Sequence, residues 1–144
     1  MMKAAGNTIE LSIGSSFEFL ELVSSITINI LQMIGFDDDT AQWVELSVRE
    51  SVINAIKHGN KEDPSKPVDV KFVIGEKEVN VFVRDRGEGF DPSQLPDPLD
   101  PENLLNPNGR GIFYMRTFMD EIEYLQHPEG GTIVRMKKMC KAKE

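Results

Sequence analysis

Alternating apolar and polar positions recur in five short segments of the chain, and a spacing of two is typical of half-buried β-strands. The second and third segments are joined by Gly75-Glu76-Lys77-Glu78, which predicts a hairpin. The last two are joined by Pro128-Glu129-Gly130-Gly131, which predicts a second turn. The five predicted strands span residues 8–13, 68–74, 79–85, 121–126 and 132–139.

Apolar positions spaced three and four apart predict three helices, which span residues 17–35, 40–58 and 112–119. The first has a serine N-cap, Ser15 or Ser16, and ends at a glycine. The second follows three aspartates, which suit the positive end of a helix dipole, and stops at Gly59. The third is opened by Gly109-Arg110-Gly111.

The predicted order β-α-α-β-β-α-β-β indicates an α+β fold. We expect a two-layer α/β sandwich, with one mostly antiparallel sheet and three helices on one face. The 144 residues contain no repeat and no interdomain linker, so residues 1–144 are expected to form a single domain. Residues 91–108 contain five of the eight prolines and little apolar periodicity, which favours a functional lid over a plain connection.

Composition narrows the classes of function. The net charge of −8 disfavours a nucleic-acid partner, because phosphate contacts need concentrated Lys and Arg. The single cysteine, Cys140, cannot form an internal disulfide and fits a reducing compartment. We find no signal-peptide pattern and no run of about eighteen uncharged apolar residues. The sequence therefore predicts a cytoplasmic protein that engages no membrane.

The stretch Arg84-Asp85-Arg86-Gly87-Glu88-Gly89-Phe90 follows the third predicted strand. An acid at the end of a strand, followed by two spaced glycines, lets the backbone approach a ligand closely. The same pattern also occurs in an ordinary loop with an exposed acid. Taken alone, Asp85-x-Gly87-x-Gly89 leaves both interpretations open.

A narrow polar stripe interrupts the apolar second helix. Glu50, Asn54 and His58 are spaced four apart and are predicted to lie on one face. The amide oxygen of Asn54 could coordinate Mg²⁺, and Glu50 could orient or deprotonate a nucleophile. Alternatively, both side chains simply meet water at a helix edge. His58 is better explained as a residue at the helix end than as a metal ligand.

Two further signals lie later in the chain. Gly109, Arg110 and Gly111 precede a predicted helix, where free backbone N–H groups form an anion site. Glycine also serves as a plain N-cap, so this signal is weak by itself. Thr132 opens the last predicted strand and could donate a hydrogen bond to a ligand, although β-branched residues commonly begin strands.

These four signals occur in one order that resembles the N, G1, G2 and G3 boxes of the superfamily containing gyrase, heat-shock chaperone, histidine kinase and mismatch-repair ATPases (GHKL). The resemblance covers about residues 45–136. Residues 54–60 (NAIKHGN), together with residues 109–115 and 119–124, resemble the corresponding segments of bacterial anti-sigma factor serine/threonine kinases. The resemblance implies a Bergerat-type ATP-binding fold.

The resemblance also implies a role for each candidate residue. Asp85 would bind the adenine amino group, Gly87 and Gly89 would let the backbone pass beside the base, and Thr132 would support the adenine end. Asn54 would hold Mg²⁺ and Glu50 would be the catalytic carboxylate. Gly109, Arg110 and Gly111 would lie against the phosphates, and residues 91–108 would be the ATP lid.

The function implied is that of a Mg²⁺- and ATP-dependent protein serine/threonine kinase that acts as an anti-sigma factor. Such a kinase phosphorylates an anti-sigma factor antagonist, binds a sigma factor and usually forms a homodimer. An alternative is an ATP-binding regulatory module that sequesters a partner without transferring phosphate. A catalytic fragment of a histidine kinase is disfavoured by the chain length and by the His58-Gly59 ending of the first box.

Overall fold

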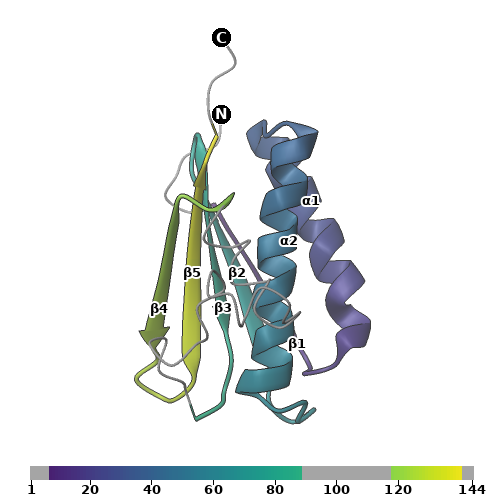
Figure 1. The fold of residues 1–144 in the computed structure, drawn as a ribbon, viewed down its shortest axis with the longest axis vertical. Helices are drawn as coiled ribbons and strands as arrows, with labels where there is room; N and C mark the ends of the chain where they lie inside the picture. Colours follow the sequence, from purple (N-terminus) through teal and green to yellow (C-terminus); the bar gives the residue numbers. More distant parts are fainter. Residues whose placement is uncertain (1–6, 89–117, 141–144) are drawn as a thin grey trace, which may run out of the picture.

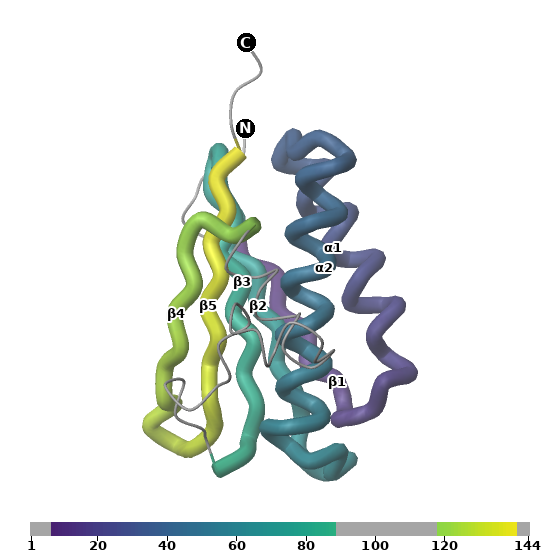
Figure 2. The backbone as a smooth tube through the Cα atoms, viewed as in Figure 1, coloured from purple at the N-terminus to yellow at the C-terminus, as the bar shows by residue number. Residues whose placement is uncertain are grey.

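A computed structural model of the chain describes residues 7–88 and 118–140. Five antiparallel strands form one sheet in the order β1-β2-β3-β5-β4 (Figures 1 and 2). The strands are β1 (Thr8–Ile13), β2 (Val68–Ile74), β3 (Glu78–Arg84), β4 (Glu121–Gln126) and β5 (Thr132–Met139). Four strands match their predicted bounds, and β3 is shifted by one residue.

The helical layer lies on one face of the sheet, as Figure 1 shows. It contains a 3-10 turn η1 (Phe17–Phe19), the helices α1 (Leu20–Ile34) and α2 (Asp38–Asn54), and a π-helical turn η2 (Ala55–Gly59). The two-layer α+β fold is thus confirmed. The third predicted helix and the predicted lid lie outside the described residues, apart from the end of that helix at residue 118.

The bounds of α2 correct the prediction at both ends. The helix begins at Asp38 rather than Thr40, because the side chain of Asp37 caps it by accepting a 2.8 Å hydrogen bond from the Thr40 N–H. It ends as an α-helix at Asn54 and continues as η2 to Gly59. Hydrophobic spacing does not distinguish a π-turn from the α-helix that precedes it.

One hydrophobic core fills the space between the two layers. Alternate residues of β2 and β3 point toward the helices, which explains the period of two in their sequences. Each fully buried valine, phenylalanine or methionine side chain contributes about 1.5–3 kcal/mol to stability. The fully buried core residues include Val44, Val48, Val52, Val70, Phe72, Val81 and Met136.

The first helical segment is unusually apolar. Residues Phe17–Ile34 have a mean hydropathy of 1.4 over 18 residues, which is long and apolar enough to cross a membrane by length and composition alone. In the structure, Val23, Ile30 and Leu31 of this segment are buried in the core. Only 33% of the segment is buried inside the structure, and length and composition alone are weak evidence for a membrane span.

The opposite face of the sheet carries charged pairs. Arg135 on β5 contacts Glu121 and Glu123 on β4 at 3.0 and 2.8 Å. Lys137 contacts Glu78 on β3 at 3.1 Å. Hydrogen bonds to these carboxylates raise the pKa of Arg135 and of Lys137 above their usual values. This face is polar because no helix in the described part of the chain covers it.

Candidate active site

Asp85 directly follows β3 and is only 4% exposed. Its Oδ1 atom accepts hydrogen bonds from the backbone N–H groups of Gly87 at 2.9 Å and Thr132 at 3.2 Å. Its own N–H donates to the carbonyl oxygen of Thr132 at 3.0 Å. The carboxylate is therefore buried in a fixed orientation, with Oδ2 left without a hydrogen-bond partner among the described residues.

Three glycines surround Asp85 so closely that no side chain would fit. A Cβ atom added to Gly59 would lie 2.3 Å from Asp85 Oδ2, and one added to Gly87 would lie 2.0 Å from the Gly59 carbonyl oxygen. Gly131 has a φ of +93°, and its Cβ would lie 2.0 Å from the Asp85 carbonyl oxygen. Close approach to other backbone atoms requires glycine at positions 87 and 131, whereas a side chain at position 59 would have to displace the Asp85 carboxylate.

Thr132 brings a second polar group to this place. The residue is 2% exposed, and its Oγ1 atom is buried with no hydrogen-bond partner among the described residues. A buried hydroxyl without a partner costs free energy, which a ligand with a matching polar atom would recover. A carboxylate oxygen can accept from an N–H donor and a hydroxyl can donate to a ring nitrogen, and the edge of adenine presents both kinds of group.

Glu50 and Asn54 lie one turn apart on α2 and are both half-buried. Burial raises the pKa of Glu50 above its usual 4.5, while the positive charge of Arg49 opposes that rise. Among the described residues, neither side chain has a hydrogen-bond partner.

The described residues offer few side chains that could bind the predicted Mg²⁺ ion. Within residues 7–88 and 118–140, no group of three or more His, Cys, Asp or Glu side chains could hold a metal ion. Mg²⁺ needs few protein ligands, because waters and phosphate oxygens complete its coordination. The Asn54 amide oxygen remains the residue that would hold it.

The structure brings the two halves of the predicted site together. The turn η2 continues from Asn54 to Gly59, and Gly59 packs against the Asp85 carboxylate. Asp85 and Thr132 meet because β3 and β5 are neighbours. Their roles in nucleotide binding stay predictions. Gly89, Gly109, Arg110 and Gly111 lie outside the described residues.

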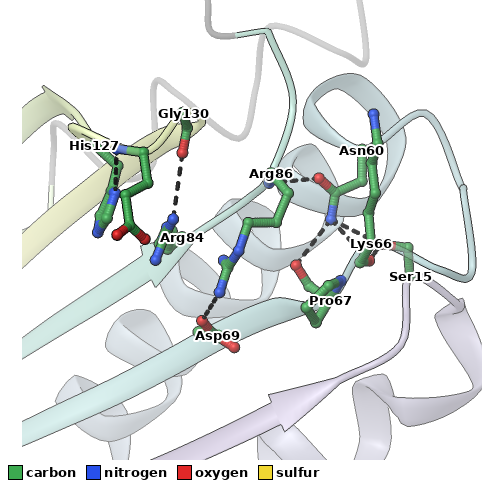
Figure 3. Close-up of polar contacts among 10 residues, drawn as sticks. Ser15, Asn60, Lys66, Pro67, Asp69, Arg84, Arg86, His127 and Gly130 are labelled. Atoms are coloured by element: carbon green, nitrogen blue, oxygen red, sulfur yellow. Dashed lines mark hydrogen bonds and ion pairs between the residues drawn. The ribbon is translucent and has the colours of Figure 1, made fainter.

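Three residues around this site, shown in Figure 3, were given no role by the sequence analysis. Arg84 and Arg86 flank Asp85: Arg86 pairs with Asp69, and Arg84 donates a 3.4 Å hydrogen bond to the Gly130 carbonyl oxygen. Asn60 accepts a hydrogen bond from the Arg86 N–H. In the sequence, Asn60 stood out only as the last residue of segment 54–60, which carries the resemblance but assigned it no role.

The chain is similar in sequence to serine-protein kinases of two Bacillus species. The chain is 28% identical over 143 residues to the serine-protein kinase RsbW of Bacillus subtilis (strain 168), covering 95% of this chain and 88% of the relative. It is 26% identical over 135 residues to the serine-protein kinase RsbW of Bacillus cereus (strain AH820), covering 90% and 83%.

A solved structure gives the same fold. The structure of the RsbU and RsbW domains of Rv1364c from Mycobacterium tuberculosis superposes with a TM-score of 0.65 at 18% identity. The alignment covers 92% of this chain and 32% of that longer chain. Residues 16–138 match the family described as the histidine kinase-like ATPase domain. With the fold, the buried acid and the family match in agreement, the chain belongs to the histidine kinase-like ATPase domain family.

Proposed function

We propose that the protein is a Mg²⁺- and ATP-dependent serine/threonine kinase that phosphorylates an anti-sigma factor antagonist in the cytoplasm. When it is free of the antagonist, it binds and silences a sigma factor. It acts as a homodimer. The family match supports ATP as the nucleotide. The names of the relatives support serine as the acceptor of the phosphoryl group.

The observation that carries this proposal is the arrangement of the Asp85 carboxylate. It is buried and held by two backbone N–H groups, one of them that of Thr132, whose buried hydroxyl has no hydrogen-bond partner among the described residues. A buried acid in this arrangement favours a base that donates an N–H group, and so favours adenine over guanine, which offers a carbonyl oxygen at the same position. Asp85, Gly87 and Thr132 together would bind the adenine.

Glu50 supplies the acid–base part of the proposed reaction. The serine hydroxyl oxygen attacks the γ-phosphorus, the bond from that phosphorus to the β–γ bridging oxygen breaks, and ADP leaves with the electron pair. The hydroxyl proton passes to the Glu50 carboxylate. The raised pKa of Glu50 improves it as a proton acceptor at neutral pH, because the carboxylate is more basic. Mg²⁺, held by Asn54, would neutralise charge on the phosphates.

The test is transfer of radiolabel from γ-labelled ATP to a candidate antagonist protein. Glu50→Gln should retain ATP binding and lose at least about 100-fold in transfer rate, the range expected for removal of a general base. Glu45→Gln is the matched control, because Glu45 lies on the same helix and pairs with Arg49 at 2.9 Å. Full transfer by the Glu50 variant would remove that residue from the mechanism.

The same assay separates the alternative function. A module that sequesters its partner without phosphotransfer would form a nucleotide-dependent complex and leave the antagonist unlabelled. An acid-stable label on serine supports the kinase. An acid-labile label on histidine would instead indicate a histidine-kinase fragment.

A further inference from the structure

Asn60 lies at the junction of three segments that are far apart in the sequence. It follows η2 directly, and although it is polar its side chain is only 1% exposed (Figure 3). A buried carboxamide must satisfy its donors and acceptor within the protein. The partners it selects therefore show what the residue holds in place.

The amide nitrogen of Asn60 holds the segments at the base of β1 and β2. Its Nδ2 atom donates to Ser15 Oγ at 2.9 Å and to the carbonyl oxygens of Lys66 and Pro67, both at 3.1 Å. The Ser15 hydroxyl also donates to the Lys66 carbonyl oxygen at 2.5 Å. Three acceptors on one side fix which end of the amide carries nitrogen.

The amide oxygen of Asn60 faces the candidate site. Its Oδ1 atom accepts a 2.6 Å hydrogen bond from the N–H of Arg86, the residue after Asp85. That N–H belongs to the same planar peptide unit as the Asp85 carbonyl group. The preceding peptide unit is fixed by the bond from the Asp85 N–H to Thr132. Asn60 and Thr132 thus restrain the two peptide planes on either side of the Asp85 Cα atom.

The two residues that follow Asn60 have a strained backbone. Lys61 and Glu62 have φ values of +53° and +58°, a left-handed conformation that side chains disfavour. Two consecutive non-glycine residues in this region persist only where the surrounding structure determines them. The N–H of Asn60 also bonds to the Ala55 carbonyl oxygen at 2.8 Å, which closes the π-turn.

We infer that Asn60 is a positioning residue that sets the orientation of the Asp85 carboxylate and thereby the selectivity for the base of the nucleotide. The inference rests on the proposed function, because it assigns Asp85 to base recognition. Asn60 itself touches Asp85 only through the peptide group that Arg86 shares with it. Replacing Asn60 should therefore reduce the discrimination between bases. A substitution that only lowers stability should not have this effect.

The experiment compares Asn60→Ala with Ser15→Ala, using ATP and GTP as probes at a temperature where each variant is folded. Asn60→Ala should lower the affinity for ATP and the ATP-over-GTP preference by at least about tenfold. Ser15→Ala removes a partner of the Asn60 nitrogen and leaves the bond to Arg86. It should lower stability while keeping the preference of the unaltered protein. A folded Asn60→Ala protein with the unaltered preference would overturn the inference.

A second measurement does not depend on a folded variant. In the unaltered protein, the Arg86 amide should be protected from hydrogen exchange as strongly as amides of β3, although Arg86 lies beyond the strand. Exchange of Arg86 as fast as that of the exposed Glu88 amide would overturn the inference. If Asp85→Asn weakens ATP binding and Asn60→Ala does not alter selectivity, the inference alone fails. If the unaltered protein binds no ATP, the proposed function fails and the inference falls with it.

Discussion

Gly59 packs directly against the carboxylate of Asp85, so that a Cβ atom at position 59 would lie 2.3 Å from Oδ2 and 2.4 Å from Cγ. Gly59→Ala should displace the carboxylate, weaken ATP binding and lower stability by about 1–3 kcal/mol, as overpacking does. Gly14→Ala is the matched control, since its Cβ would meet nothing closer than 3.8 Å. Calorimetric titration and urea unfolding measure the two effects. An unchanged affinity for ATP in the Gly59 variant would contradict the assignment.

Asp85→Asn should weaken ATP binding by about 10- to 100-fold, the equivalent of a hydrogen bond to a charged group. The fold should remain intact, because asparagine preserves the shape and can still accept from Gly87 and Thr132 through its amide oxygen. Asp39→Asn, at an exposed position in the first turn of α2, controls for the loss of one negative charge. Equal ATP affinity in all three proteins would disprove base recognition by Asp85.

Glu50 should make stability depend on pH. Its pKa is raised in the folded state, so the folded protein binds more protons than the unfolded chain above the usual value of 4.5. The stability that Glu50 contributes is therefore lost as the pH rises from the usual value of 4.5 through the raised pKa of the folded protein. Glu50→Gln should be more stable than the unaltered protein at about pH 7, and this advantage should shrink toward about pH 4. Urea unfolding at both pH values measures it, and an advantage that does not change with pH would contradict the shift.

Trp43 gives the protein an intrinsic fluorescence reporter, because it is the single tryptophan. Its ring stacks on that of Phe118, with centroids 4.2 Å apart and an interplanar angle of 12°. Phe118→Leu should shift the indole emission to longer wavelength by increasing its contact with water. Phe82→Leu, on the opposite face of the sheet, should leave the emission unchanged. An identical spectrum for the Phe118 variant would exclude the stack in solution.

The strands and the order of elements could be predicted from the sequence, because burial on one face imposes a period of two that β2 and β3 follow throughout. The resemblance also located Asp85 and Thr132, which the structure places side by side. Their distance in sequence did not matter, since each ends or opens a strand of the same antiparallel pair.

The contribution of Asn60 could not be predicted in this way. Its partners come from positions 15, 66, 67 and 86, and three of these contacts involve backbone atoms that every residue type provides. A side chain that binds backbone groups leaves no complementary residue in the sequence. The π-turn that places it was hidden for a related reason, because its apolar spacing continues that of α2.

The last strand of the described chain occupies an inner position in the sheet. β5 lies between β3 and β4, as Figure 2 shows by the yellow tube beside the teal one. During synthesis, β3 therefore presents an open edge until residue 139 has left the ribosome, and an open edge can pair with other chains. Thr132 reaches Asp85 at that same moment. A nascent chain thus places Thr132 beside Asp85 only when β5 closes the sheet.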